Sequence, residues 1–72
     1  MFFLKNLKFL QNNMKLSEFS KITKISYRTL QDIFARESNN PKADTLIKLK
    51  EAFNISIDDI LLKDLSSKED TL

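Results

Sequence analysis

Five short stretches of this chain place their apolar residues three or four positions apart, and this spacing limits the fold more than any other feature. Such a period gathers apolar side chains on one face of an α-helix, and no stretch shows the alternation of a half-buried strand. Asn12, Asn13, Pro41 and Asn54 stand between the stretches and are typical of positions where helices end or begin. The sequence therefore predicts an all-α fold, a compact domain of five short helices.

The same pattern predicts where the helices lie and which side chains they bury. We expect helices over about residues 2–12, 16–23, 27–36 and 43–53, and a fifth helix that begins after Ser56 and has Leu62 near its end. Ser26 and Ser56 stand at N-cap positions, and Asp59 completes a carboxylate variant of the capping box with Ser56. The side chains expected to face the core are Phe3, Leu7, Leu10, Met14, Leu16, Phe19, Ile22, Leu30, Ile33, Phe34, Leu46, Leu49, Phe53, Ile57, Ile60 and Leu61, with Ile47 beside them.

The second and third predicted helices are separated by a connection of only three residues, Lys24 to Ser26. Two helices joined by so short a turn have the spacing of a helix-turn-helix motif. Such a turn often contains Gly, and here Lys24 holds that place. We therefore expect a left-handed or strained backbone at Lys24, at a cost of about 1 kcal/mol relative to Gly.

The outer face of the predicted helix 27–36 carries an unusual set of polar side chains, namely Tyr27, Arg28, Gln31 and Asp32. In a DNA major groove, Arg can bond guanine through two atoms, Gln can bond adenine, and Asp can accept from the cytosine amino group. Tyr27 can reach a phosphate or a thymine methyl group, or it can be a half-buried aromatic cap. Asp32 can equally hold Arg28 in position one turn away, and we favour that role.

Composition argues against catalysis. The chain contains no His, Cys or Gly, so it lacks the usual general base, thiolate ligands and a Gly-rich phosphate loop. We expect no enzymatic activity, no metal and no cofactor. No apolar run approaches the length of about 20 residues that a membrane span needs, and the apolar start is too short for a signal peptide. We expect a cytoplasmic protein.

Charge is divided unevenly along the chain. Residues 1–57 hold ten basic and five acidic residues, whereas residues 58–72 hold two basic and five acidic ones. A basic body suits a surface that faces phosphate, with the acidic end turned away from it. We expect a DNA-binding domain over residues 1–64 and a flexible acidic tail over residues 65–72.

An ordered set of residues also resembles a known family. The set is Phe19, Ser20, Thr23, Ile25, Ser26, Thr29, Leu30, Ile33, Pro41, Leu46 to Leu49, and Phe53 to Leu61. These residues, in this order and spacing, resemble the Cro and phage-repressor type of helix-turn-helix domain, also called the XRE family. The resemblance implies a lambda-repressor-like fold and a homodimer that binds short palindromic sites in double-stranded DNA and represses transcription.

The resemblance also implies roles for individual residues. Tyr27 and Arg28 match the positions where base reading begins, and Gln31 with Asp32 match the next turn. The positions that often contact phosphate in this family are here Lys15, Ser26, Thr29, Asn39, Asn40 and Lys42. No ligand-binding domain fits in 72 residues, so we expect no small-molecule ligand.

The sequence departs from the family pattern at four positions, one of them Lys50, which stands where a small residue is common. Lys24 replaces the turn Gly, and Arg36 stands where Gly commonly ends the third helix. Phe34 stands where many members have a Glu that pairs with an Arg of the first helix, and no Arg lies there. We expect an apolar contact in place of this ion pair.

Phe2 and Phe9 lie seven positions apart, nearly opposite the apolar stripe of the first predicted helix. Either the N-terminus folds over Phe9, or the two rings form a second apolar face that a partner covers. In the second case the chain could instead be a protein-interaction module, such as an antitoxin bound to a toxin, with DNA binding secondary. The environment of the two rings distinguishes these hypotheses.

Overall fold

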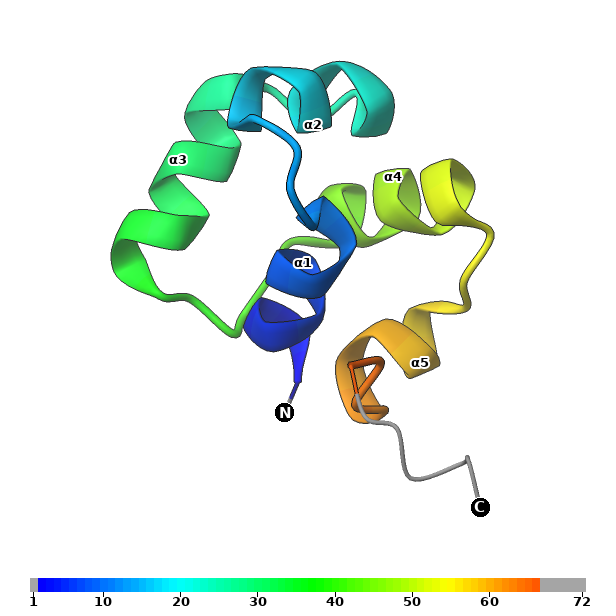
Figure 1. Ribbon diagram of the computed structural model, residues 1–72. Coiled ribbons are helices and arrows are strands. Elements are labelled where there is room, and N and C mark those ends of the chain that lie inside the picture. Colours follow the sequence, from blue (N-terminus) through cyan, green and yellow to red (C-terminus); the bar gives the residue numbers. More distant parts are fainter. Residues whose placement is uncertain (1, 67–72) are drawn as a thin grey trace.

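The computed structural model describes residues 2–66, which form five helices and no strand (Figure 1). The helices are α1 (Phe3–Gln11), α2 (Leu16–Thr23), α3 (Tyr27–Arg36), α4 (Ala43–Phe53) and α5 (Ile57–Leu62). The predicted all-α fold is confirmed, and the three central helices begin and end at the predicted residues. Helix α1 is one residue shorter at each end than expected, and α5 begins directly after Ser56, as its capping signal predicted.

All five helices contribute to one core. The buried apolar side chains are Phe3, Leu7, Phe19, Ile25, Leu30, Ile33, Leu46, Leu49 and Ile60. The rings of Phe19 in α2 and Phe53 in α4 pack with their centroids 6.0 Å apart. Burial of each such side chain is worth about 1.5–3 kcal/mol, so this core holds α3 in place from behind. Phe34 packs against the same core in a half-buried position.

The prediction that Ile22 faces the core is wrong. The Ile22 side chain is 48% exposed, and Thr23 is buried in its place; Ile47, expected beside the core, is also exposed, at 46%. The Thr23 hydroxyl donates to the carbonyl oxygen of Phe19 (2.8 Å) and accepts from the N–H of Ile25 (3.2 Å). A polar group with both hydrogen bonds satisfied can be buried without penalty, and the helix period then places Ile22 outside.

Polar contacts join α1 to the end of α5. The amide of Asn6 is fully buried and donates to the carbonyl oxygens of Ile60 and Lys63, both at 2.7 Å. Its oxygen accepts from the N–H of Leu65 at 2.9 Å. These bonds hold the segment after α5 against α1, and the structure describes the chain up to Ser66. Residues 67–72 of the predicted tail lie outside the described residues. The proposed domain boundary at residue 64 stays a prediction.

Four helix ends have residues with positive φ, although the chain has no Gly. Lys24 (φ 64°), Glu37 (φ 50°) and Asn54 (φ 56°) adopt the left-handed conformation that closes α2, α3 and α4. Of the two conformations expected at Lys24, left-handed or strained, the structure therefore has the left-handed one. At the end of α3 the left-handed residue is Glu37, one position after Arg36. Glu37 and Ser38 donate backwards to Phe34 and Ile33, the pattern of a Schellman motif.

Candidate nucleic-acid interface

The turn between α2 and α3 is held by side chains of its own residues. The Ser20 hydroxyl donates to the carbonyl oxygen of Ile25 across the turn (2.6 Å). Ile25 is buried in the core, and Lys24 between them has φ 64° and ψ 19°. These contacts fix the direction in which α3 leaves α2. The helix-turn-helix arrangement expected from the short connection is therefore present (Figure 1).

The first turn of α3 is closed by two hydroxyl groups. The Ser26 oxygen accepts from the N–H of Thr29 at 3.1 Å, as predicted for an N-cap. The Ser26 hydroxyl in turn donates to the Thr29 oxygen at 2.8 Å. Both side chains are exposed, and the proton of the Thr29 hydroxyl remains free to donate. An oxygen of a DNA phosphate is a suitable acceptor for such a proton.

The outer face of α3 is exposed as its helical period predicts. Tyr27 (46% exposed), Arg28, Gln31 and Asp32 all lie on the surface, opposite the buried Leu30 and Ile33. Arg28 makes no ion pair with any described residue. The four side chains able to reach base edges therefore lie together on one exposed side of one helix.

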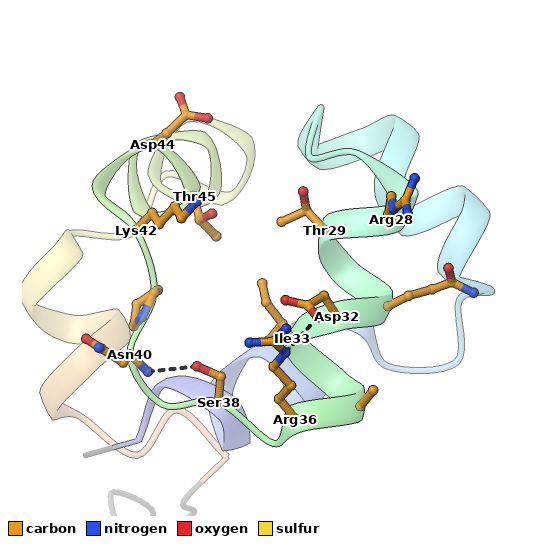
Figure 2. A pocket seen from close by; sticks show the side chains of 13 residues that line it. Arg28, Thr29, Asp32, Ile33, Arg36, Ser38, Asn40, Lys42, Asp44 and Thr45 are labelled. Atoms are coloured by element: carbon orange, nitrogen blue, oxygen red, sulfur yellow. Dashed lines mark hydrogen bonds and ion pairs between the residues drawn. The ribbon is translucent and has the colours of Figure 1, made fainter.

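The prediction that Asp32 holds Arg28 in position is wrong, because Asp32 pairs with Arg36. The Arg36 Nε lies 2.8 Å from the Asp32 Oδ1 (Figure 2). Both Arg residues are four positions from Asp32, but an acid that precedes its base is the more favourable order on a helix. Arg36 also occupies the last turn of α3, where the helix dipole favours a positive charge.

A groove of about 870 Å³ separates α3 from the loop after it and the start of α4 (Figure 2). Arg28, Thr29, Gln31 and Asp32 lie along its α3 side, and Asn40 and Lys42 lie across from them. Six predicted contact residues therefore share this groove. The others do not line it: Lys15, Ser26, Tyr27 and Asn39.

Sequence reasoning missed Arg36, Ser38 and Thr45, which also line the groove. Ser38 accepts a hydrogen bond from the N–H of Asn40 at 3.2 Å and so shapes the loop opposite α3. Arg36 stood four residues after Asp32, a spacing that signals an ion pair on any helix. Ser38 and Thr45 carried no such signal, because their position depends on how α4 packs.

The charges along the groove are mixed but favour anions. Arg28, Arg36 and Lys42 oppose two carboxylates, Asp32 and Asp44. Each carboxylate is already engaged in an ion pair on its own helix, Asp32 with Arg36 and Asp44 with Lys48, the latter at 3.2 Å. Arg28 and Lys42 make no ion pair within residues 2–66, so they offer their charge to a polyanion.

Phe2 is the N-cap residue of α1, and Phe9 lies within that helix. Neither residue lines the groove. Phe9 is 49% exposed, and Phe2 is 37% exposed while its N–H donates to the carbonyl oxygen of Leu61 at 2.9 Å. The described N-terminus thus leaves half of the Phe9 ring open. A partner interface at these rings stays a prediction.

The structure bears on two other expectations. Within residues 2–66, no three His, Cys, Asp or Glu side chains come together as a metal site would require. In the same part of the chain, no helix has both the length and the apolar character needed to cross a membrane.

Comparison with known proteins gives one match. The family model of the Cro/C1-type helix-turn-helix DNA-binding domain matches residues 9–62, from the end of α1 to the end of α5. Neither the curated proteins nor the solved structures provide a match. The matched segment is more than half of the chain and contains the turn, α3 and both sides of the groove. This chain therefore belongs to the family of Cro/C1-type helix-turn-helix DNA-binding domains.

Proposed function

We propose that this chain is a transcriptional repressor that binds a specific DNA site as a homodimer, with α3 in the major groove. The observation that carries the proposal is the exposed set of Tyr27, Arg28, Gln31 and Asp32 beside a groove with unpaired cations. Family membership supports DNA binding and transcription regulation. Repression, pairing of two chains and the individual base contacts go beyond family membership and belong to the proposal.

Such an interface contains two kinds of contact, those to the phosphate backbone and those to base edges. Lys42 and Asn40 on one side of the groove, with Thr29 on the other, suit the phosphate backbone, which positions the protein without reading sequence. Arg28 and Gln31 suit base edges, which carry the sequence information. Lys15, Ser26 and Asn39 remain proposed phosphate contacts outside the groove.

The test is fluorescence anisotropy of labelled duplexes, using sites selected by the protein from a random library and scrambled duplexes of equal length. We expect affinity for the selected duplex to fall steeply as salt rises, because phosphate contacts release counterions. Arg28→Ala should reduce the preference for the selected duplex by about 5- to 150-fold, the range of one lost bidentate base contact. Arg28→Lys keeps the charge but not the two parallel hydrogen bonds. Relative to Arg28→Ala, it should recover more of the affinity for DNA than of the preference for the selected duplex.

Lys50→Ala is the matched control, since Lys50 is an exposed cation of α4 that does not line the groove. It should lower affinity slightly and leave the preference unchanged. Failure of the wild-type protein to bind any duplex at low salt contradicts the proposal. Equal preference in wild type and Arg28→Ala removes Arg28 from the base-reading set.

A protein-interaction role is the second candidate, and the exposed ring of Phe9 is the observation that favours it. We propose that Phe2 and Phe9 meet a partner surface, either the second chain of a homodimer or a different protein such as a toxin. Phe9→Ser leaves the core intact because Phe9 is not part of it. If the variant becomes monomeric in sedimentation and binds DNA weakly, the rings serve the homodimer. If it stays dimeric and binds DNA normally, the homodimer does not use Phe9.

A further inference from the structure

The ion pair between Asp32 and Arg36 lies inside the surface proposed to face DNA (Figure 2). Both side chains are more than half exposed, and both line the groove. A carboxylate at this place is unexpected, because it repels the phosphates that Arg28 and Lys42 attract. Its pairing with Arg36 also withholds a third cation from the same phosphates.

An exposed ion pair on a helix contributes little to folding stability, so it can be broken at small cost. The pair is therefore a poor candidate for a purely structural feature. Arg36 sits at the last position of α3, next to the left-handed Glu37, and its side chain is 74% exposed. Such a side chain is free to change partner from a carboxylate to a phosphate.

We propose that Asp32 is a selectivity residue that withholds Arg36 from DNA until a correct site is bound. This inference rests on the proposed function. On a non-specific duplex, separation of the pair leaves Asp32 facing phosphates with no partner, so Arg36 stays with Asp32. At a correct site, the amino group of a cytosine donates to the Asp32 carboxylate in the major groove, and Arg36 moves to a backbone phosphate.

The exchange has a measurable consequence for affinity. In the wild-type protein, Arg36 neutralises a phosphate only in the specific complex. In Asp32→Asn the guanidinium is free in every complex, so binding to scrambled DNA should tighten. The slope of log affinity against log salt on scrambled DNA should steepen by about 0.9, the contribution of one more neutralised phosphate. Preference for the selected duplex should fall about tenfold, as expected for loss of one base contact.

The experiment measures anisotropy on selected and scrambled duplexes over a salt series, for wild type, Asp32→Asn, Arg36→Gln and the double variant. On scrambled DNA, Arg36→Gln should make the slope of log affinity against log salt less steep in the Asp32→Asn background. In the wild-type background it should leave that slope nearly unchanged. Site selection repeated with Asp32→Asn should lose the requirement for cytosine at one position and keep the others. All four proteins should fold, because both side chains are exposed, and circular dichroism checks this.

Asp44→Asn is the matched control, since Asp44 also lines the groove and also pairs with a cation four residues later. If Asp44→Asn raises scrambled-DNA affinity and lowers preference as much as Asp32→Asn, only net charge matters and the proposal is wrong. If Arg36→Gln changes the salt slope on scrambled DNA equally in the wild-type and Asp32→Asn backgrounds, the proposal is also wrong. Wild-type protein that binds no duplex defeats the proposed function and this inference together. Selective wild-type binding with unchanged preference in Asp32→Asn defeats this inference alone.

Discussion

Asn39, in the loop between α3 and α4, accepts a hydrogen bond from the backbone N–H of Leu4 in α1 over 2.9 Å. The residues are 35 positions apart, and Phe2 at the N-cap position of α1 supplies no side-chain cap. Asn39 therefore caps α1 from a distant loop. The same loop continues into Asn40 and Lys42, which line the groove, so this bond joins the first helix to the proposed phosphate contacts.

Substitution Asn39→Ala should lower the free energy of unfolding by about 0.5–2 kcal/mol, the usual cost of a lost N-cap. Urea denaturation followed by circular dichroism measures this. Asn40→Ala is the neighbouring control, because within residues 2–66 only its backbone N–H is bonded, to Ser38. It should leave stability nearly unchanged and weaken DNA binding. Equal stability of the two variants would show that the cap is dispensable.

Asn6→Leu should destabilise the domain by about 2–4 kcal/mol, because the variant leaves one buried and two partly buried backbone groups without their partner. The groups are the carbonyl oxygens of Ile60 and Lys63 and the N–H of Leu65. Hydrogen exchange at the Leu65 N–H, which lies beyond the end of α5, should accelerate more than exchange within α5. Asn13→Leu is the control, since Asn13 is exposed. If Asn6→Leu lowers the free energy of unfolding no more than Asn13→Leu does, the structural role of Asn6 is contradicted.

Lys24→Gly should stabilise the protein by about 0.5–1 kcal/mol, because Gly adopts the left-handed conformation without the penalty of a Cβ atom. The measured quantity is the midpoint of urea denaturation at constant slope. Lys21→Gly is the matched control inside α2, and it should destabilise by about 1 kcal/mol. Destabilisation by Lys24→Gly instead would mean that the Lys24 side chain itself contributes to the turn.

The ion pair between Lys5 and Asp64 predicts a dependence on pH. The Lys5 Nζ lies 2.7 Å from the Asp64 Oδ2. Hydrogen bonds from Lys5 and then Ser66 lower the pKa of Asp64 below its ordinary value of 3.8. A carboxyl whose pKa is lower in the folded state stabilises the fold above its unfolded pKa. That contribution disappears as pH falls through the folded pKa.

Lys5→Met should therefore raise the pKa of Asp64 toward its ordinary value and make stability less sensitive to acid below the unfolded pKa. Carbon-detected NMR titration of the Asp64 carboxyl group measures the pKa directly. Lys8→Met is the control, because Lys8 is exposed on the same helix and forms no ion pair with a described residue. If Asp64 has the same pKa in Lys5→Met and Lys8→Met, Lys5 is not the cause of its lowered pKa.

Most of the secondary structure and half of the candidate site were predictable from the sequence. Period and capping located α2, α3 and α4, and the three-residue connection predicted the left-handed Lys24. The outer face of α3 followed from the same period, since Leu30 and Ile33 had to face inward. These features depend on residues close together in the chain, whose geometry one helix sets by itself.

Only the tertiary structure decided which polar groups are partners across longer distances. Asn6 and Asn39 read as ordinary surface residues, yet they bond backbone groups 54 to 59 and 35 positions away. The groove exists because α4 and its loop lie opposite α3, which no local pattern reports. Asp32 had two equally spaced Arg residues, and the order of charges with the helix dipole selected Arg36. Local periodicity thus determined the helices of this protein, whereas packing between distant segments determined its groove and its buried hydrogen bonds.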